Sequence, residues 1–307
     1  MAFITCPNRS PFALWRATAV AGLVGLLGAL CAQAVNAQDA QSLRARHTAM
    51  REALASSLFQ RPLVLESTQA DGNLKGDVYA VVAQPFSVVG PALQAGEHWC
   101  DVLIVHLNVK QCRARGAGAQ STVNLVVGRK FDQPLEDAYQ VVFAYRLAAS
   151  EPDYLQVRLD AEAGPLGTKN YRIVFEAVPL DANRSFVHMS YSYAYGMAAR
   201  LAMEGYLATL GRDKVGFSTV GRKPDGSAEY VSSVRGLIER NTMRYFLAIE
   251  AYLGALALPP AQQADKRMSD WYTATERHAR QLHEMERDEY ITMKRKEVAR
   301  QQASPEK

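Results

Sequence analysis

Between residues 109 and 195 the chain carries six segments in which apolar and polar residues alternate. The clearest of them places Tyr139, Val141, Phe143, Tyr145 and Leu147 on one face. Because successive side chains of a strand point to opposite sides, each segment reads as a strand with one buried face. One apolar and one polar face per strand is typical of an antiparallel sheet that is covered on one side only.

The last of these segments leads directly into a helix. Phe186 and His188 share one face of the strand, and the opposite face carries Val187, Met189, Tyr191, Tyr193 and Tyr195. At Gly196 the period changes to helical spacing, with a stripe made of Ala199, Met203, Tyr206 and Leu210. We expect the helix over residues 197–210 to cover the concave face of the sheet. Its small residues leave an apolar space beside it.

The flanking segments complete the order of elements. Residues 40–60 read as a helix, 63–68 and 76–83 as strands, and 85–103 as two short helices. Residues 211–235 read as a long excursion with a hairpin. Two helices are predicted after it, over residues 236–256 and 261–301, before a short tail. The pattern indicates an α+β fold with additional C-terminal helices.

The segment that begins at Gly76 resembles a known group of domains. It reads Gly76-Asp-Val-Tyr-Ala-Val-Val-Ala-Gln-Pro-Phe-Ser-Val-Val and is followed by a helix that contains Trp99. This run is similar to the opening of START-like domains of the helix-grip (SRPBCC) superfamily, over about residues 63–212. The resemblance implies a curved antiparallel sheet that grips a long helix around an apolar cavity. Members bind lipids, sterols or similar small molecules, and some are cyclases or hydrolases.

The start of the chain has the features of a signal peptide. Arg9 and Arg16 precede an uncharged apolar stretch over residues 17–30, and Val35-Asn36-Ala37 offers small residues at a cleavage site. The alternative is an uncleaved membrane anchor, although the stretch is short for a span, which needs about 20 residues. Leu30 before Cys31 argues against a lipoprotein.

We therefore divide the chain into a signal peptide (1–37), a START-like domain (38–235) and a C-terminal helical extension (236–307). The mature protein begins near Gln38, is periplasmic or secreted and has no stable transmembrane span. Loss of Arg9 and Arg16 lowers the net charge from +4 to +2. So balanced a charge does not favour a nucleic-acid partner.

Two cysteines, Cys100 and Cys112, remain after cleavage. In an oxidising compartment they are expected to form a disulfide. By closing a loop in the unfolded chain the bond is worth roughly 3 kcal/mol. The alternative is a pair of separate buried thiols.

The sequence shows none of the common catalytic motifs. It lacks a Gly-x-Ser-x-Gly elbow, a His-Glu-x-x-His pair, a Cys-x-x-Cys pair and a phosphate-binding loop. His278 and His283 are five residues apart and point to different faces of a helix, which disfavours a metal site. We assign no catalytic residue, metal or cofactor, and we lean against an enzyme.

The candidate ligand-binding residues lie on the last strands and the helix after them. They are Tyr191, Tyr193, Tyr195, Met203, Tyr206, Phe143 and Tyr145. Tyrosine combines apolar area with a hydroxyl, which suits amphipathic ligands. The alternative is core packing with the hydroxyls at the rim. Arg240 and Arg244 share a helix face and are able to meet a carboxylate or phosphate, or to form ion pairs with neighbouring helices.

Three functions compete at this point. The first is an exported binding protein for a hydrophobic or lipid-like small molecule. The second is a helix-grip enzyme of the cyclase or hydrolase type, which would use a cavity residue such as Tyr193 or His188. The third is an envelope assembly protein that docks a protein partner through its C-terminal helices.

Overall fold

The computed structural model describes residues 40–70, 72–116, 121–209 and 211–303. The predicted signal peptide lies outside these residues. Within them, we find no helix with the length and apolar character that a membrane span requires.

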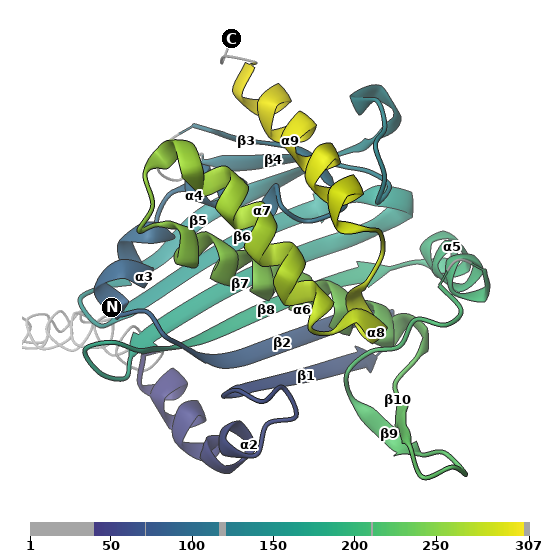
Figure 1. The fold of residues 1–307 in the computed structure, drawn as a ribbon, viewed down its shortest axis with the longest axis horizontal. Coiled ribbons are helices and arrows are strands. Elements are labelled where there is room, and N and C mark those ends of the chain that lie inside the picture. The colour runs from purple at the N-terminus through teal and green to yellow at the C-terminus, as the bar shows by residue number, and fades with distance from the viewer. Residues whose placement is uncertain (1–39, 71, 117–120, 210, 304–307) are drawn as a thin grey trace, which may run out of the picture. The chain divides into compact units, whose positions relative to one another are not determined.

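The core of the fold is one antiparallel sheet of eight strands, shown in Figure 1. Its spatial order is β1-β2-β8-β7-β6-β5-β4-β3. The strands are β1 (Leu63–Ala70), β2 (Asn73–Val82), β3 (Val109–Arg115), β4 (Thr122–Val127), β5 (Tyr139–Glu151), β6 (Tyr154–Ala163), β7 (Thr168–Pro179) and β8 (Ser185–Tyr195). The short 3-10 helices η2 (Leu135–Asp137) and η3 (Pro165–Gly167) lie in two of the connections.

The strand register places the two faces of β8 in different surroundings. Tyr191 lies opposite Ile173 of β7 and Gly76 of β2, so its side chain joins the buried inner face. On the outer face, Phe186 stacks against Tyr79 at a centroid distance of 6.3 Å. The alternation read from the sequence is therefore the alternation of the sheet. The curved, one-sided sheet confirms the predicted α+β fold of the helix-grip type.

The helix that covers the sheet is α6 (Ser233–Ala255), which packs against β1, β2 and β8. The prediction that the helix over residues 197–210 fills this role was wrong. That segment forms α5 (Met197–Ala208), in which Ala199 is buried while Met197 and Leu201 are 69% and 61% exposed. Leu210 lies outside the described residues. Helix α5 lies against η3, β8 and α6, and it leaves the centre of the sheet to α6.

A close approach of backbones lets α6 lie on the sheet. A Cβ atom added at Gly76 of β2 would sit 2.2 Å from Oγ1 of Thr242 on α6. Only glycine fits this crossing, because any larger residue would push the helix away. The opposite side of α6 is covered by α7 (Pro260–Glu276), so α6 is buried nearly all round.

Helix α7 forms a third layer, with α6 between it and the sheet (Figure 1). The single helix predicted over residues 261–301 is instead three helices: α7, α8 (Ala279–Leu282) and α9 (Arg287–Ala303). The last of them contacts both α7 and β3. The excursion before α6 contains the expected hairpin, β9 (Thr219–Arg222) with β10 (Ala228–Tyr230). The domain boundary at residue 235 stays a prediction, and the helix that spans it packs on the sheet.

Helices α3 (Phe86–Ala92) and α4 (Gly96–Leu103) follow β2 in the order that the sequence predicts. Trp99 of α4 is buried and its ring nitrogen donates a hydrogen bond to the Leu93 carbonyl at 3.0 Å. The predicted disulfide is confirmed: Cys100 of α4 is bonded to Cys112 of β3. It ties the helical connection to the edge strand of the sheet.

The outer face of the sheet has a partial cover from the N-terminal segment. Residues 43–49 are helical and lead into α2 (Arg51–Ala55). The His47 ring lies 4.8 Å from that of Phe186, and Arg46 pairs with Glu66 of β1 at 2.6 Å. Both contacts fix this segment to β1 and β8.

Candidate functional site

A cavity of about 200 Å³ lies between the inner face of the sheet, α5 and α6. Strands β7 and β8 contribute one wall and α6 the opposite wall. Ala199 and Met203 of α5 and the residues of η3 close one side. The cavity lining also includes His106, Asn108, Val127, Thr168, Tyr171, Tyr191, Tyr193, Leu237, Asn241 and Tyr245.

Four tyrosine rings from three elements pack together around this cavity. Tyr171 and Tyr193 stack with their centroids 5.1 Å apart, and Tyr191 meets Tyr245 of α6 edge-on at 5.0 Å. Burial raises the pKa of Tyr191 and Tyr193 well above the usual value, so both hydroxyls stay protonated at physiological pH. The wall therefore presents aromatic faces with neutral hydroxyl groups.

The hydroxyls on this wall have local partners. Tyr171 donates to Oγ1 of Thr168 at 2.8 Å, and Tyr193 lies 3.8 Å from the sulfur of Met203. A sulfur atom is a weak acceptor. The Tyr193 hydroxyl is therefore available for a stronger partner, such as a polar group of a ligand.

His106 brings one more polar group to the cavity. Its ring stacks on Tyr245 at 4.6 Å, and its Nδ1 accepts a hydrogen bond from the Asn108 backbone at 3.2 Å. Burial, followed by the nearby positive charges of Arg244 and Lys294, holds the pKa of His106 well below its usual range. The ring is therefore neutral, and its Nε2 has no hydrogen-bond partner among the residues that the structure describes.

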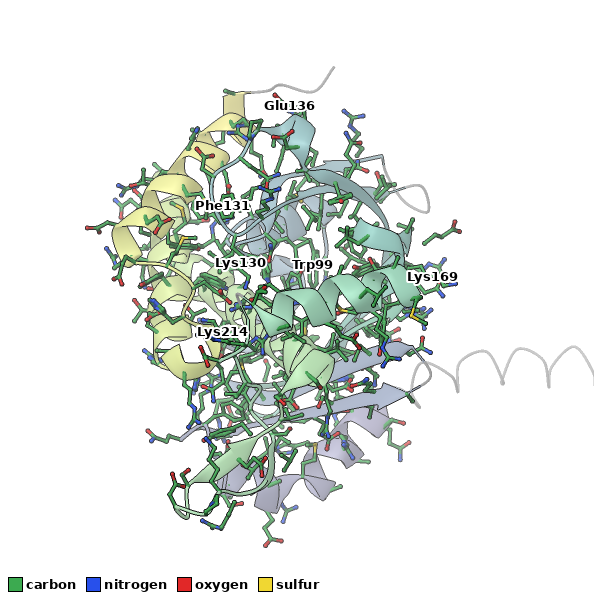
Figure 2. The ribbon with its side chains drawn as sticks, turned by 90° about the vertical axis from the view of Figure 1, so that its right-hand side faces the viewer. Trp99, Lys130, Phe131, Glu136, Lys169 and Lys214 are labelled. Atoms are coloured by element: carbon green, nitrogen blue, oxygen red, sulfur yellow. A yellow bond between two sulfur atoms is a disulfide. The ribbon has the colours of Figure 1, made fainter. Side chains whose placement is uncertain are left out.

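Beyond the cavity, toward the C-terminal end of α5, lies a group of charged side chains that we call the basic cluster. It consists of Lys130, Lys214, Arg240 and Arg244 around Glu284. Figure 2 labels both lysines, which approach the same carboxylate, Lys130 at 2.6 Å and Lys214 at 3.9 Å. Burial and the Arg244 charge lower the pKa of Lys130 to about 8, although Glu284 offsets part of the effect.

The predicted site residues divide between the cavity and other places. Tyr191, Tyr193 and Met203 line the cavity, as proposed for them. Tyr206 lies at the basic cluster, where its hydroxyl accepts a hydrogen bond from Lys130 at 2.9 Å. Tyr195 faces a different groove near the end of β1, with its hydroxyl bonded to Gln69 at 3.2 Å.

Two further predicted residues belong to the core rather than to the cavity lining. Phe143 is buried and does not line the cavity, and it meets the lining residue Tyr171 edge-on at 6.3 Å. Tyr145 is buried beside Gly96, and burial raises its pKa to about 12. The roles of all seven residues in binding remain predictions.

The sequence reasoning missed Tyr171, His106, Asn241 and Tyr245 as cavity residues. Tyr245 lies on the helix predicted over residues 236–256, and that helix was not expected against the sheet. Asn241 lies on the same helix and was missed for the same reason. No local signal marks His106, because it lies in the connection between α4 and β3.

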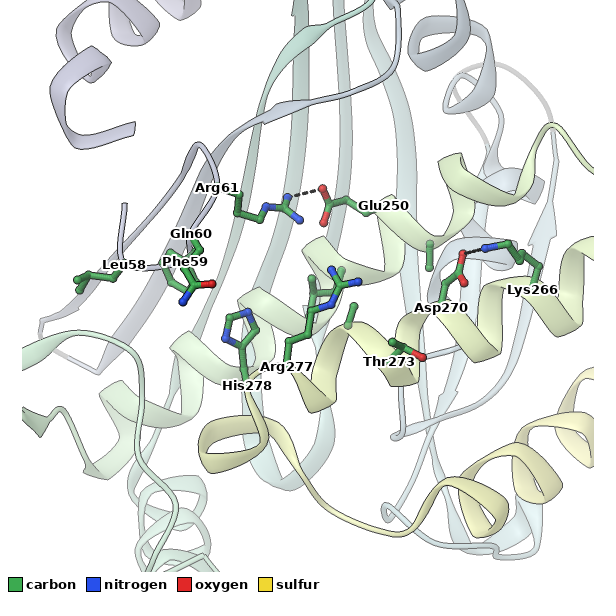
Figure 3. A pocket seen from close by; sticks show the side chains of 13 residues that line it. Leu58, Phe59, Gln60, Arg61, Glu250, Lys266, Asp270, Thr273, Arg277 and His278 are labelled. Atoms are coloured by element: carbon green, nitrogen blue, oxygen red, sulfur yellow. Dashed lines mark hydrogen bonds and ion pairs between the residues drawn. The ribbon is translucent and has the colours of Figure 1, made fainter. Parts of the chain in front are cut away.

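A larger, open groove of about 950 Å³ lies on another side of the molecule, where residues 58–61 approach α6 and α7 (Figure 3). Arg61 pairs with Glu250 and Lys266 with Asp270, and Arg277 also lines the groove. Burial and then the charge of Arg61 lower the pKa of His278 at its base.

Comparison with known proteins gives solved structures only: no family model and no curated protein matches. Norcoclaurine synthase from Thalictrum flavum is 14% identical, over 48% of this chain and 82% of the synthase, with a TM-score of 0.32. The Zhui aromatase/cyclase from Streptomyces sp. R1128 is 13% identical over 66% and 96%, with a TM-score of 0.34. Ara h 8.0201 is 12% identical over 60% and 99%, with a TM-score of 0.36. With TM-scores this low, these similarities carry no argument about the site.

Proposed function

We propose that this protein binds a hydrophobic or lipid-like small molecule in the cavity between the sheet, α5 and α6. The observation that carries the proposal is the cavity itself, which has aromatic walls and a few polar groups with weak or missing partners. Binding sites for small molecules have this composition.

The volume limits what the cavity holds in this structure. About 200 Å³ lies below the usual range for such sites, about 300–1,000 Å³. Helix α5 is the element that can yield, because most of its surface is exposed and its apolar Met197 and Leu201 face solvent. A larger ligand is accommodated if α5 moves outward while Ala199 and Met203, its cavity-lining residues, stay against the ligand.

Export is part of the proposal. The Cys100–Cys112 disulfide is typical of proteins in oxidising compartments. Together with the signal-peptide pattern of residues 1–37, it supports a carrier that acts in the periplasm or outside the cell.

Substitution at Ala199 tests the cavity. Ala199 is 2% exposed and lines the cavity, whereas Ala198 on the same helix is exposed. We expect the parent protein and Ala198→Trp to bind the neutral fluorophore N-phenyl-1-naphthylamine, and Ala199→Trp to lose binding because its ring fills the space. If Ala199→Trp keeps full binding, the fluorophore sits elsewhere and the cavity is not the site.

A second measurement is designed to identify the natural ligand. Organic extraction of the protein purified from its source, followed by mass spectrometry, should recover an apolar molecule that is absent from extracts of Ala199→Trp. If the parent protein neither yields such a molecule nor binds the neutral fluorophore, the binding proposal is wrong.

A further inference from the structure

Arg240 forms no hydrogen bond and no ion pair with the residues that the structure describes. Its side chain is 0% exposed, and none of its three guanidinium nitrogens has a hydrogen-bond partner among the described residues. Burial, and then the charge of Arg244, lower its pKa to about 10, which still leaves it protonated at neutral pH. A buried unpaired cation is strongly destabilising.

The neighbouring carboxylate Glu239 does not supply that partner. Its Oε1 accepts a hydrogen bond from Ser67 at 2.5 Å, and its Oε2 accepts the backbone N–H groups of Phe217 and Ser218 at 2.6 and 2.9 Å. These bonds fasten the segment before the β9–β10 hairpin to α6. Both oxygens of Glu239 therefore accept hydrogen bonds from other groups, and neither is bonded to Arg240.

The other charges of the basic cluster share a single carboxylate. Arg244 lies 2.6 Å from Glu284, Lys130 also lies 2.6 Å from it, and Lys214 lies 3.9 Å away. With Glu239 included, four cations face two carboxylates, so the cluster keeps a surplus of positive charge. A buried surplus of positive charge is expected of an anion-binding site without its anion.

The basic cluster and the tyrosine cavity adjoin each other. Asn241 lines the cavity, and its Oδ1 accepts a hydrogen bond from Nη1 of Arg244 at 3.4 Å. Arg240 directly precedes this Asn241 on α6 and lies behind the cavity lining rather than in it. A ligand whose body lies against Tyr193 therefore brings its end within the field of Arg240.

We propose that Arg240 and the basic cluster bind the carboxylate or phosphate headgroup of the molecule whose apolar part fills the tyrosine cavity. This inference rests on the proposed function and adds the ligand's chemical class: an amphipathic anion. An arginine presents paired N–H donors that match carboxylate and phosphate oxygens, and such charge-assisted bonds are strong. The lysines contribute charge around the same group.

Displacement of N-phenyl-1-naphthylamine by ligands with a common chain tests the inference on the full protein. The ligands are dodecanol, laurate and dodecyl phosphate, with inorganic phosphate alone as the fourth arm. We expect at least one of the two acids to bind about tenfold more tightly than dodecanol. Inorganic phosphate should neither displace the fluorophore nor raise the melting temperature as the acids do.

Three variants of α6 separate the roles. Arg240→Met should reduce the preference for acid over alcohol to less than about twofold while dodecanol binding is unchanged, and Arg240→Lys should keep part of the preference. Arg235→Met is the matched control, because Arg235 lies on the same helix but outside the cavity and bonds to Ser67. It should keep the full preference.

The melting temperature of the ligand-free protein distinguishes a binding role of Arg240 from a purely structural one. Because Arg240 lacks a partner, Arg240→Met should melt at the parent temperature or above it. A lower melting temperature of Arg240→Met, together with an unchanged acid preference, overturns the inference.

Equal binding of dodecanol and both acids to the parent protein also overturns the inference, but leaves the proposed binding of a hydrophobic molecule intact. Stabilisation by inorganic phosphate that equals that by dodecyl phosphate identifies a free-anion site and overturns the headgroup assignment.

Discussion

On the outer face of the sheet, His188 lies between two carboxylates. Its Nε2 is 2.9 Å from Asp77 and its Nδ1 is 2.7 Å from Glu176, while its ring stacks on Tyr79 at 4.4 Å. The sequence analysis placed His188 opposite the tyrosine row, and the structure confirms that face. His188 is therefore a structural residue outside the cavity, whereas Tyr193 lines the cavity.

The pKa values of this triad shift in directions that favour the charged forms. Burial alone would raise the pKa of Asp77 and Glu176, but their hydrogen bonds to His188 outweigh it and lower both. Burial alone would lower the pKa of His188, but its bonds to the two carboxylates raise it. The folded state thus prefers an imidazolium between two carboxylates.

These directions predict a pH window for stability. The carboxylates stabilise the fold above their ordinary pKa values of 3.8 and 4.5, and lose this as the pH falls through their lowered values. His188 stabilises fully below 6.5 and loses this as the pH rises through its raised value. We expect His188→Gln to lower the melting temperature most near about pH 5.5 and less near about pH 9. A difference that stays constant with pH would show that the imidazolium is not involved.

At the scale of elements, the crossing of α6 over β2 depends on Gly76. We expect Gly76→Ala to cost about 1–3 kcal/mol, because its Cβ would overlap Oγ1 of Thr242. Thr242→Ala should recover part of the loss in the double variant. Gly205→Ala is the control, since no atom lies within 4 Å of the added Cβ and the change favours the helix. Additive costs in the double variant, measured by chemical denaturation, would mean that the two residues do not meet.

Helix α9 is held by a buried ion triad. Lys110 of β3 lies 3.0 Å from Oε1 of Glu297, and Lys294 lies 2.7 Å from its Oε2, with all three side chains at most 1% exposed. Removing one member leaves uncompensated buried charge. We expect Glu297→Gln to cost about 3–5 kcal/mol in the free energy of unfolding, against little for Glu289→Gln on the exposed side of α9. A small cost for Glu297→Gln would show that α9 is not anchored through this triad.

The sequence predicted strands better than it predicted which helix the sheet grips. Alternation reports burial directly, which is why β5 and β8 were found with their faces. A helical stripe shows that a face is buried but not what buries it, so Ala199 and Met203 were compatible with either role. The better signal lay in α6, whose apolar residues surround the whole helix, as expected for burial on both sides.

The breaks between α7, α8 and α9 carry no sequence signal of the usual kind. Residues 277–286 contain neither glycine nor proline. Side chains from elsewhere bind the carbonyls of this segment instead: Arg244 binds Leu282, Lys214 binds His283 and Tyr272 binds Met285. These tertiary bonds replace helical ones and bring Glu284 to the basic cluster. Neither the break nor the cluster follows from local pattern, because both need the three-dimensional neighbours.

At the scale of the whole molecule, α6 lies between a sheet and a layer of helices, and each layer contributes to the site. The sheet supplies the tyrosines, α6 supplies Asn241 and the arginines, and the segment between α8 and α9 supplies Glu284. The helices after residue 236 are therefore not separable from the proposed binding site. This weighs against an assembly role in which those helices dock a partner independently of the sheet.

The final prediction joins export and oxidation in a count of thiols. The sequence has four cysteines, of which Cys6 and Cys31 lie in residues 1–37 and Cys100 and Cys112 form the disulfide. Protein from its native compartment should begin near Gln38 and show no free thiol when unfolded without reductant, then two after reduction. Two free thiols before reduction and four after it would mean that the signal peptide is retained. In the cleaved protein, reduction should lower the free energy of unfolding by roughly 3 kcal/mol, because the unfolded chain regains the freedom of the closed loop.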